Sequence, residues 1–280
     1  MKKEAKIIIL SGQSNAVGVA HQNYLKRHFS AEKVAEFEAG YDKIKVNFYS
    51  HNYKSNGFVP VTLGLAEENK ATFGPEVGIA EYLTEKYPGE EFFIIKCAFG
   101  GSAIYSGDWF SPSIFNIGSY EDTKHSKING ERVKGWCYNE LVHIIEESIK
   151  MLQKDGYEPN LRAFCWMQGE SEACGREMTE KYIDLYDHLI HDVVVCFPEL
   201  FKSCLFIDAA VADDTIWQFA KEMNKNKLEY SKKASNRRFI DTVAAGLTTK
   251  NEPESQPDVA HYDSESVIKL GKLFAEACEF

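Results

Sequence analysis

The stretch that decides the fold is KIIILSGQSNAVG, which covers residues 6–18. Its apolar run from Ile7 to Leu10 contains three β-branched residues and predicts a short strand that is buried on both faces. The strand ends at a small polar turn that contains Gly12 and carries Ser14 in its middle. Because ligands of open α/β sheets bind where the strands end, Ser14 is a candidate nucleophile. A serine after a strand can equally cap the next helix, and this segment by itself does not separate the two roles.

Further strand patterns alternate with helix patterns along the chain. We expect strands at residues 7–10, 44–49, 92–98, 161–167 and 205–209, with a short further strand at 238–241. We expect helices at residues 75–87, 136–154, 182–197, 216–234 and 264–278, partial helix at 21–40, and loops at 50–70 and 105–132. Strands separated by helices predict parallel βαβ units with helices on both faces of the sheet. We find no linker, repeat or low-complexity tract and therefore expect one domain over residues 1–280.

The composition is that of a globular protein and narrows the range of partners. Hydrophobic residues make up 44% of the chain and charged residues 26%, so we expect a core large enough to hold a rigid site. The net charge of −10 disfavours nucleic acid and anionic membranes, and favours a small or neutral substrate. No apolar run approaches the roughly 20 residues of a membrane-spanning helix.

The N-terminus and the cysteines favour a cytoplasmic location. The apolar run after the basic N-terminal segment is only four residues long, whereas a secretory signal needs roughly 7–15. Secretion of a processed form stays open. The seven cysteines are irregularly spaced and include no Cys-x-x-Cys pair, which argues against a zinc site or a redox dithiol and favours reduced thiols.

A serine nucleophile requires a base, and one of the eight histidines differs from the others. His261 follows Asp258 by three residues, in a loop just before the last predicted helix. In a turn this spacing can place the carboxylate beside Nδ1 of the imidazole and leave Nε2 free to face a serine. By itself an Asp-x-x-His pair is a common coincidence. The remaining histidines lie within predicted helices, or in loops and loose helices without a nearby acid: His21, His28, His51, His125, His143, His188 and His191.

Two other polar turns follow predicted strands and can supply donors to an oxyanion. Gly100 and Gly101 follow the third strand and let the backbone approach a substrate closely, although a simple tight turn explains the pair as well. Gln168 follows the fourth strand and offers a side-chain amide, or is a solvated loop residue. Since the carboxyl ends of parallel strands share one edge of the sheet, these turns can converge on Ser14.

Four sequence blocks resemble, in order, those of the SGNH hydrolases. They are Gly12-Gln13-Ser14-Asn15, Lys96-x-Ala98-x-Gly100-Gly101-Ser102, Trp166-x-Gln168-Gly169-Glu170-Ser171 and Asp258-x-x-His261. The Gln-Gly-Glu block resembles more narrowly the sialate O-acetylesterase and carbohydrate esterase family 6 branch. The blocks span residues 12–261, and each lies at a predicted strand end or before the last helix. The Gly-x-Ser-x-Gly elbow of the α/β-hydrolases is absent, because Ala16 fills its last position.

The resemblance implies a three-layer α/β/α sandwich with a flavodoxin-like, five-stranded parallel sheet. It implies Ser14 as nucleophile, His261 as general base and then acid, and Asp258 as the residue that orients His261. It implies an oxyanion hole made of the backbone amides of Ser14 and Gly101 and the side-chain amide of Gln168. It implies supporting or substrate-contacting roles for Gln13, Asn15, Gly100, Ser102 and Glu170.

The role of Glu170 has two physical options. Its carboxyl group can form a hydrogen bond to the turn that carries Ser14, or it can act as a second acid near His261. We favour the structural role. The expected chemistry requires no metal ion and no cofactor.

The expected reaction removes O-acetyl groups from a carbohydrate, such as acetylxylan or an acetylated sialic acid, through an acyl-enzyme on Ser14. The partner is then a small-molecule or oligosaccharide acetyl ester, with no nucleic acid and no membrane, and the oligomeric state stays open. The alternatives are a lipase-like or thioesterase-like SGNH hydrolase, and a non-catalytic relative that binds carbohydrate or phosphate.

We expect specificity to lie in the long loop at residues 105–132 and around Met167. Three aromatic residues at the start of this loop can stack on a sugar ring or simply anchor the loop: Tyr105, Trp109 and Phe110. The chain departs from the family pattern at three positions that we expect at the rim of the site: Ala16, Met167 and Glu172.

Overall fold

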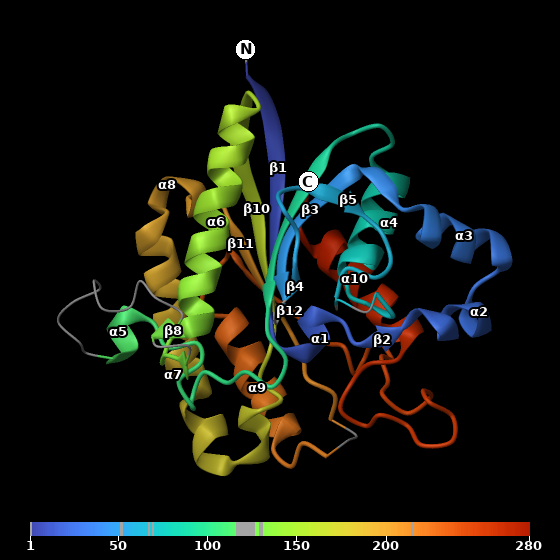
Figure 1. Ribbon diagram of the computed structural model, residues 1–280. Coiled ribbons are helices and arrows are strands. Elements are labelled where there is room, and N and C mark those ends of the chain that lie inside the picture. Colours follow the sequence, from blue (N-terminus) through green and yellow to red (C-terminus); the bar gives the residue numbers. More distant parts are fainter. Residues whose placement is uncertain are drawn as a thin grey trace.

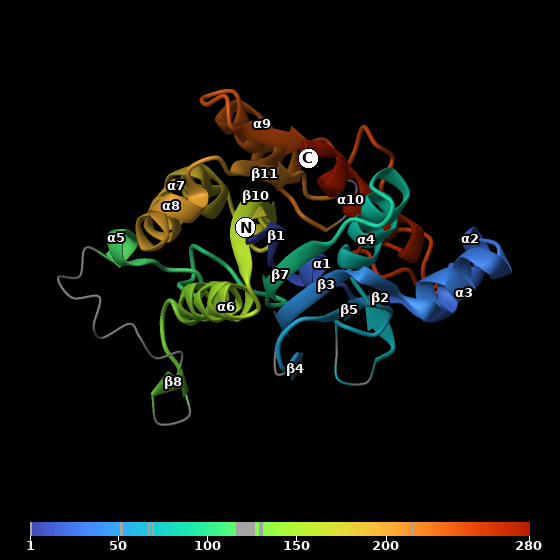
Figure 2. The ribbon, with the colours of Figure 1, turned by 90° about the horizontal axis from the view of Figure 1, so that it is seen from above.

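The computed structural model describes residues 2–50, 53–66, 68, 70–115, 127–128, 131–213 and 216–280. At its centre is an eight-stranded sheet with helices on both faces (Figures 1 and 2). Along the sheet the strands follow the order β12-β11-β10-β1-β7-β3-β4, and β5 also pairs with β3. Their bounds are β1 (Lys3–Gly12), β3 (Tyr41–Ser50), β4 (Tyr53–Lys54), β5 (Val59–Val61), β7 (Phe92–Ala98), β10 (Tyr157–Met167), β11 (Leu205–Ala209) and β12 (Arg237–Ile240).

Two layers of helices enclose this sheet. Figure 2 shows α6 (Trp136–Lys154) and α7 (Arg176–Cys196) on one face, and α4 (Glu76–Lys86) and α10 (Ser264–Ala277) on the other. The other described helices are α1 (Ser14–Val17), η1 (Gln22–Tyr24), α2 (Leu25–His28), α3 (Ala31–Ala39), α5 (Pro112–Phe115), η3 (Glu172–Cys174), α8 (Pro198–Phe201) and α9 (Ala220–Ser231). Two small antiparallel pairs lie outside the main sheet: β2 (Ala20–His21) with β6 (Thr72–Phe73), and β8 (Lys127–Ile128) with β9 (Glu131–Arg132).

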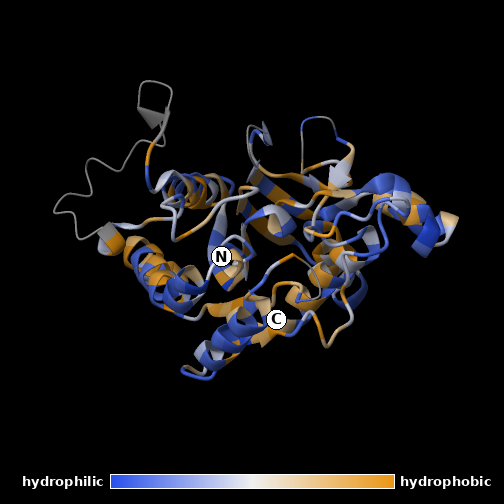
Figure 3. Cartoon of the chain, turned by 90° about the horizontal axis from the view of Figure 1, so that it is seen from below, coloured by the Kyte–Doolittle hydropathy of each residue, from blue (hydrophilic) through white to orange (hydrophobic). Residues whose placement is uncertain are grey.

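The centre of the sheet is the most deeply buried part of the core. The strand β1 lies between β7 and β10 and is parallel to both. The side chains from Ile7 to Leu10 have no exposed surface, and every residue of β7 is buried. Helices cover both faces of these strands, so their apolar residues run continuously instead of alternating with polar ones. In Figure 3, which looks toward the carboxyl ends of the strands, the surrounding helices carry hydrophobic and hydrophilic residues on different sides.

The α/β sandwich agrees with the prediction, but the sheet is larger than expected. Its parallel part comprises β3, β7, β1, β10, β11 and β12, and is therefore six strands wide instead of five. Residues 50–70, expected to form a loop, contribute β4 and β5, which pair with β3 in antiparallel orientation. These strands are two and three residues long and one contains Pro60, so they carry no periodic pattern. The helix expected at 182–197 begins earlier, at Arg176. Its first turn is mostly polar, so the apolar pattern that marks a helix in the sequence starts only further along.

The parallel strands bring their carboxyl ends to one edge of the sheet. In Figure 1 the N-terminus, where β1 begins, is at the top, and α1, which follows β1, is at the bottom. The loop that precedes α10 lies at the same lower edge. No helix within the described ranges is both long and apolar enough to span a membrane.

Candidate active site

The turn after β1 is fixed to the ends of both neighbouring strands. The N–H of Gln13 donates to Met167 O at 2.9 Å, and the N–H of Phe99 donates to Gly12 O at 3.1 Å. Gly12 has a φ of +141°, and a Cβ atom at this position would lie 1.9 Å from Met167 O, so only glycine fits. Ser14 follows as the first residue of α1 and is 8% exposed. Its hydroxyl group makes no hydrogen bond to any residue that the structure describes.

Asp258 and His261 form the pair that their spacing suggests. Asp258 Oδ2 lies 2.7 Å from His261 Nδ1, and Asp258 Oδ1 accepts from the N–H of Ala260 at 3.1 Å. The start of their loop is anchored by Glu252, whose carboxylate accepts from Ser264 N at 2.8 Å and Ser264 Oγ at 2.7 Å. The imidazole is therefore oriented by a carboxylate that is itself fixed by the loop.

The side chain of Asn15 joins this loop to the serine turn. Asn15 Oδ1 accepts from the N–H of Tyr262 at 3.0 Å, and Asn15 Nδ2 lies 3.5 Å from Ala260 O. Asn15, the neighbour of Ser14, thus holds the residues on both sides of His261. These contacts keep the histidine loop against the turn that carries the serine. In sites without substrate the hydrogen bond between nucleophile and base is often open, and none joins Ser14 to His261 here.

Glu170 has the structural contact that we favoured from the sequence. Its Oε1 accepts from Asn15 Nδ2 at 2.8 Å, whereas its buried Oε2 has no partner among the described residues. Burial raises the pKa of the Glu170 carboxyl group above its usual value, against the opposing effect of the Asn15 hydrogen bond. Glu170 therefore supports the asparagine that holds the histidine loop.

The side-chain amide of Gln168 is not placed as we expected. Gln168 has no exposed surface, and its Nε2 lies near three acceptors: Glu172 Oε2 at 2.6 Å, Gln13 Oε1 at 3.2 Å and Ser102 O at 3.3 Å. An amide group has only two hydrogens, so none is left for an oxyanion. Gln168 as an oxyanion donor stays a prediction, which this arrangement of its amide group does not favour.

Gln13 carries the amide group that remains available beside Ser14. Its Oε1 accepts from Gln168 Nε2 and, at 3.3 Å, from the N–H of Ser171. These two bonds fix the plane of the amide. Gln13 Nε2 donates to none of the described residues, although the side chain is only 3% exposed.

The turn after β7 combines an open backbone with buried supports. Gly101 is exposed, has a φ of +68°, and has no atom within 4 Å of the position of a Cβ atom. Its N–H donates to no carbonyl group among the described residues. Ser102 next to it is buried, where its Oγ accepts from Trp109 Nε1 at 2.8 Å and donates to Phe99 O at 2.6 Å. Ser102 therefore supports the turn formed by Gly100 and Gly101, because both contacts of its hydroxyl group are to other parts of the protein.

Several residues expected to contact substrate lie in the core instead. Trp109 and Met167 have no exposed surface, and the Trp109 ring packs edge-on against Trp166 with centroids 5.0 Å apart. Ala16 and Glu172 are also fully buried, so these departures from the family pattern do not lie at the rim. Of the loop expected to determine specificity, residues 116–126, 129 and 130 lie outside the described residues, as do His51 and His125.

The carboxylate of Glu172 has a supporting role instead. Its Oε1 accepts from the backbone N–H groups of Ile104 at 2.5 Å and Tyr105 at 3.0 Å, while its Oε2 accepts from Gln168. Burial raises the pKa of this carboxyl group. Glu172 thus ties the loop after Gly101 to the turn after β10.

Two buried lysines, Lys96 and Lys227, hold the backbone at this edge of the sheet, a role that the sequence does not indicate. Lys96 Nζ donates to Val17 O and to Glu76 Oε2, both at 2.7 Å. Lys227 Nζ donates to Gln168 O at 2.5 Å, and to Asp208 Oδ1 and Ala209 O at 2.8 Å. Lys96 belongs to one of the four sequence blocks but has no role assigned there, and Lys227 lies in a helix that is mostly polar, so the sequence does not mark either lysine as a support.

The described residues contain no group of His, Cys, Asp and Glu side chains that is arranged to hold a metal ion. All seven cysteines are free thiols.

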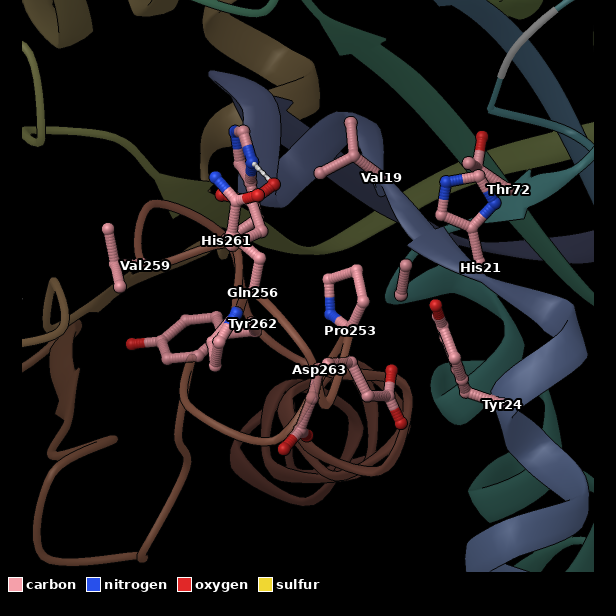
Figure 4. Close-up of a pocket in the computed structure, with 14 residues that line it drawn as sticks. Val19, His21, Tyr24, Thr72, Pro253, Gln256, Val259, His261, Tyr262 and Asp263 are labelled. Carbon is pink, nitrogen blue, oxygen red and sulfur yellow. Dashed lines mark hydrogen bonds and ion pairs between the residues drawn. The ribbon is translucent and has the colours of Figure 1, made fainter.

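A cavity of about 550 Å³ adjoins the Asp258–His261 pair (Figure 4). Both members of the pair line it, together with residues from the segment after α1 and from the loop that carries the pair. The volume is within the range of about 300–1,000 Å³ that is typical of small-molecule sites.

Comparisons with known proteins bear on the family and the fold. A family described as "carbohydrate esterase, sialic acid-specific acetylesterase" matches residues 4–279. A search of curated proteins found no match. Among solved structures, a protein from Arabidopsis thaliana is 22% identical with a TM-score of 0.68, and the match covers 98% of both chains.

Two further solved structures share the fold. NanS is 16% identical with a TM-score of 0.67, over 99% of this chain and 98% of its own. A carbohydrate acetylesterase from Xanthomonas citri is 14% identical with a TM-score of 0.60, over 98% of this chain and 55% of its own.

The clamp made by Asn15 leads to a first prediction. Asn15→Ala removes the contacts to Ala260 and Tyr262, so His261 loses its fixed position. On the hypothesis that His261 is the catalytic base, we expect kcat for p-nitrophenyl acetate to fall by about 10²-fold. The rate of labelling of Ser14 by a fluorophosphonate falls in parallel. Circular dichroism checks the fold, and Asn23→Ala, a change at an exposed residue, is the matched control. A folded Asn15→Ala protein with wild-type kcat contradicts the proposed clamp.

Asp208 leads to a prediction about pH. Burial raises the pKa of its carboxyl group from the usual 3.8 to about 6, against the attraction of Lys227. The folded chain then holds this proton to a higher pH than the unfolded chain does, so this group lowers the stability as the pH rises through that interval. We expect the difference in free energy of unfolding between wild type and Asp208→Asn to fall by on the order of 3 kcal/mol between about pH 4 and about pH 7. Urea unfolding at a series of pH values measures it, and a constant difference refutes the assignment.

Proposed function

The chain belongs to the carbohydrate esterase, sialic acid-specific acetylesterase family, and from that premise we propose that it removes O-acetyl groups from a sugar through an acyl-enzyme on Ser14. One observation carries the proposal. The loop with the Asp258–His261 pair is bound on both sides of the histidine by Asn15, the residue that follows the serine. This arrangement supports a nucleophile, a base and an orienting acid in the roles that acyl transfer requires.

In the proposed reaction, His261 acts first as a base and then as an acid. Its Nε2 takes the proton from Ser14 Oγ as that oxygen attacks the acetyl carbonyl. Asp258, 2.7 Å from Nδ1, keeps that nitrogen protonated and stabilises the imidazolium ion that forms. His261 then gives the proton to the departing sugar oxygen, and water repeats the sequence on the acyl-enzyme.

The proposed oxyanion hole uses donors that the fold leaves available. The backbone N–H groups of Ser14 and Gly101 donate to no backbone carbonyl among the described residues. The third donor that we propose is Gln13 Nε2, since Gln168 and Ser171 hold the Oε1 of the same amide. Gln168 then orients this donor and does not contact the oxyanion itself.

The serine mechanism predicts the loss of activity in two variants. With p-nitrophenyl acetate, Ser14→Ala and His261→Ala each lower kcat by roughly 10³-fold or more, because members of such a triad act as a unit. A fluorophosphonate labels the wild type at Ser14, as peptide mass spectrometry will determine.

The chain itself offers a matched control for this experiment. Ser113 Oγ lies 2.7 Å from Asp192 Oδ2 and 3.1 Å from His188 Nδ1, so it is another serine beside an acid and a histidine. Here the serine contacts both the acid and the histidine, whereas in a catalytic triad the histidine lies between the serine and the acid. We therefore expect Ser113→Ala to keep wild-type activity. Labelling at Ser113, or full activity of Ser14→Ala, refutes the proposed nucleophile.

The assignment of Gln13 is tested by a variant that preserves its acceptor. Gln13→Glu keeps an oxygen for Gln168 Nε2 and Ser171 N but removes the donor that faces the oxyanion. We expect kcat for p-nitrophenyl acetate to fall by roughly 10²–10³-fold with little change in KM, which is the usual effect of losing one such donor. If kcat stays within a few-fold of wild type at a pH where the new carboxyl group is ionised, Gln13 is not the donor.

A further inference from the structure

The cavity beside the Asp258–His261 pair has two walls from distant parts of the chain. Figure 4 shows His21, Tyr24 and Thr72 on one side, and Gln256 and Val259 on the side of the loop that carries His261. His21 and Thr72 are brought together by the β2–β6 pair, in which they are directly opposite each other. The walls thus join the segment that follows α1 to the loop that precedes α10.

We propose that this cavity binds the sugar that carries the acetyl group, and that it accepts a neutral sugar better than an anionic one such as a sialate. The inference rests on the proposed function, because it concerns the alcohol half of the ester that Ser14 attacks.

The proton transfer in the proposed mechanism indicates where the sugar has to lie. His261 must protonate the departing alcohol, so the sugar has to lie next to this residue when the ester bond breaks. The cavity is lined by His261 and measures about 550 Å³, far more than an acetyl group needs. The larger half of the ester, the sugar, therefore fits the cavity better than the acyl group does.

The lining has the chemistry that binds a sugar ring. The rings of His21 and Tyr24 meet edge to face, with centroids 6.3 Å apart, and present an aromatic edge to the cavity. Thr72 belongs to the wall behind these rings, since it is 2% exposed and its unpartnered Oγ1 is buried and not open to a ligand. Gln256 adds an amide group on the opposite wall. Aromatic side chains opposite an amide group suit a ring with apolar C–H faces and hydroxyl groups at its edge.

The charges of the lining favour a neutral ring. Three carboxyl groups line the cavity, those of Glu252, Asp258 and Asp263, while its described lining contains no lysine or arginine. Arg27 packs on the Tyr24 ring at 4.5 Å, but its guanidinium group pairs with Glu254 at 3.1 Å. The carboxylate of a sialate would meet like charges here, whereas a neutral ring would not. The carboxylates of Glu252 and Asp263 act on a ligand through their charge alone, because both are buried and already accept hydrogen bonds from the protein.

The test compares three substrates at one pH: p-nitrophenyl acetate, an acetylated xylo-oligosaccharide and an O-acetylated sialic acid. We expect the wild type to have a higher kcat/KM for the neutral sugar ester than for the sialate ester. Tyr24→Ala should lower the ratio of kcat/KM for the neutral sugar ester to that for p-nitrophenyl acetate by roughly tenfold, the loss of one aromatic contact. Asn23→Ala, on the same turn but outside the cavity, is the control that leaves this ratio unchanged.

A second variant tests the charge of the lining. Val259 lines the cavity and is 39% exposed, so Val259→Lys can add a cation without disturbing the core. It should raise kcat/KM for the sialate ester relative to the neutral ester by roughly tenfold at low salt, and less at high salt. A wild type that prefers the sialate ester, or a Tyr24→Ala variant whose ratio is unchanged, overturns the inference.

The inference and the proposed function can fail separately. If the wild type hydrolyses none of the three esters, the proposed function fails. The cavity is then tested by calorimetric binding of the acetylated xylo-oligosaccharide to Ser14→Ala and to Ser14→Ala/Tyr24→Ala. Weaker binding to the double variant supports the sugar subsite, and equal binding refutes it.

Discussion

The site depends on the hydrogen bonds of one side chain, that of Asn15. Its oxygen and nitrogen connect the serine turn to Tyr262 and Ala260, which are 247 and 245 residues away in the sequence, and to Glu170, 155 residues away. Asn15 is 2% exposed, so these bonds form where water does not compete and an unpaired amide would be costly. The same contacts that satisfy this buried amide also place the histidine loop beside Ser14. Stability and catalytic geometry are therefore linked at this residue.

Two buried ammonium groups support the same edge of the sheet. Lys96 and Lys227 have no exposed surface, and each donates to a carboxylate and to the backbone. Lys96 donates to Val17 O at the end of α1, and Lys227 donates to Gln168 O and Ala209 O at the ends of β10 and β11. Burial lowers the pKa of Lys96, against the attraction of Glu76. Removing one partner of a buried ion pair typically costs about 3–5 kcal/mol. Turns that end parallel strands lack ladder partners for their last carbonyl groups, and a lysine can satisfy two of them at once, which explains why a charge is retained in this part of the core.

The sequence predicts those features that depend on local patterns. The apolar runs of β1, β7, β10 and β11 mark buried parallel strands, and the topology then requires the turns at Ser14, Gly101 and Gln168 to share one edge. The spacing of Asp258 and His261 likewise predicts a contact within one loop. Features that depend on distant contacts could not be predicted in this way. Gln168 and Trp109, for example, lie in turns and carry a polar group. Their burial depends on packing against segments that are distant in the sequence, so the local pattern does not indicate it. The cavity wall formed by β2 and β6 comes from two strands of two residues, which give no periodic signal.

If a sugar occupies the cavity as we propose, its binding is coupled to catalysis through the loop that carries Asp258 and His261. Asp258 and His261 belong to the same loop as Gln256 and Val259, so a sugar that contacts these walls also contacts the loop that orients the base. Since the loop is bound to Asn15 at one end and to Ser264 through Glu252 at the other, it is held at both ends. In the proposed mechanism, contacts with the sugar restrict the loop further and favour the hydrogen bond between Ser14 and His261. A small ester that leaves the cavity empty would lack this effect, so binding energy from the remote sugar would appear in kcat as well as in KM.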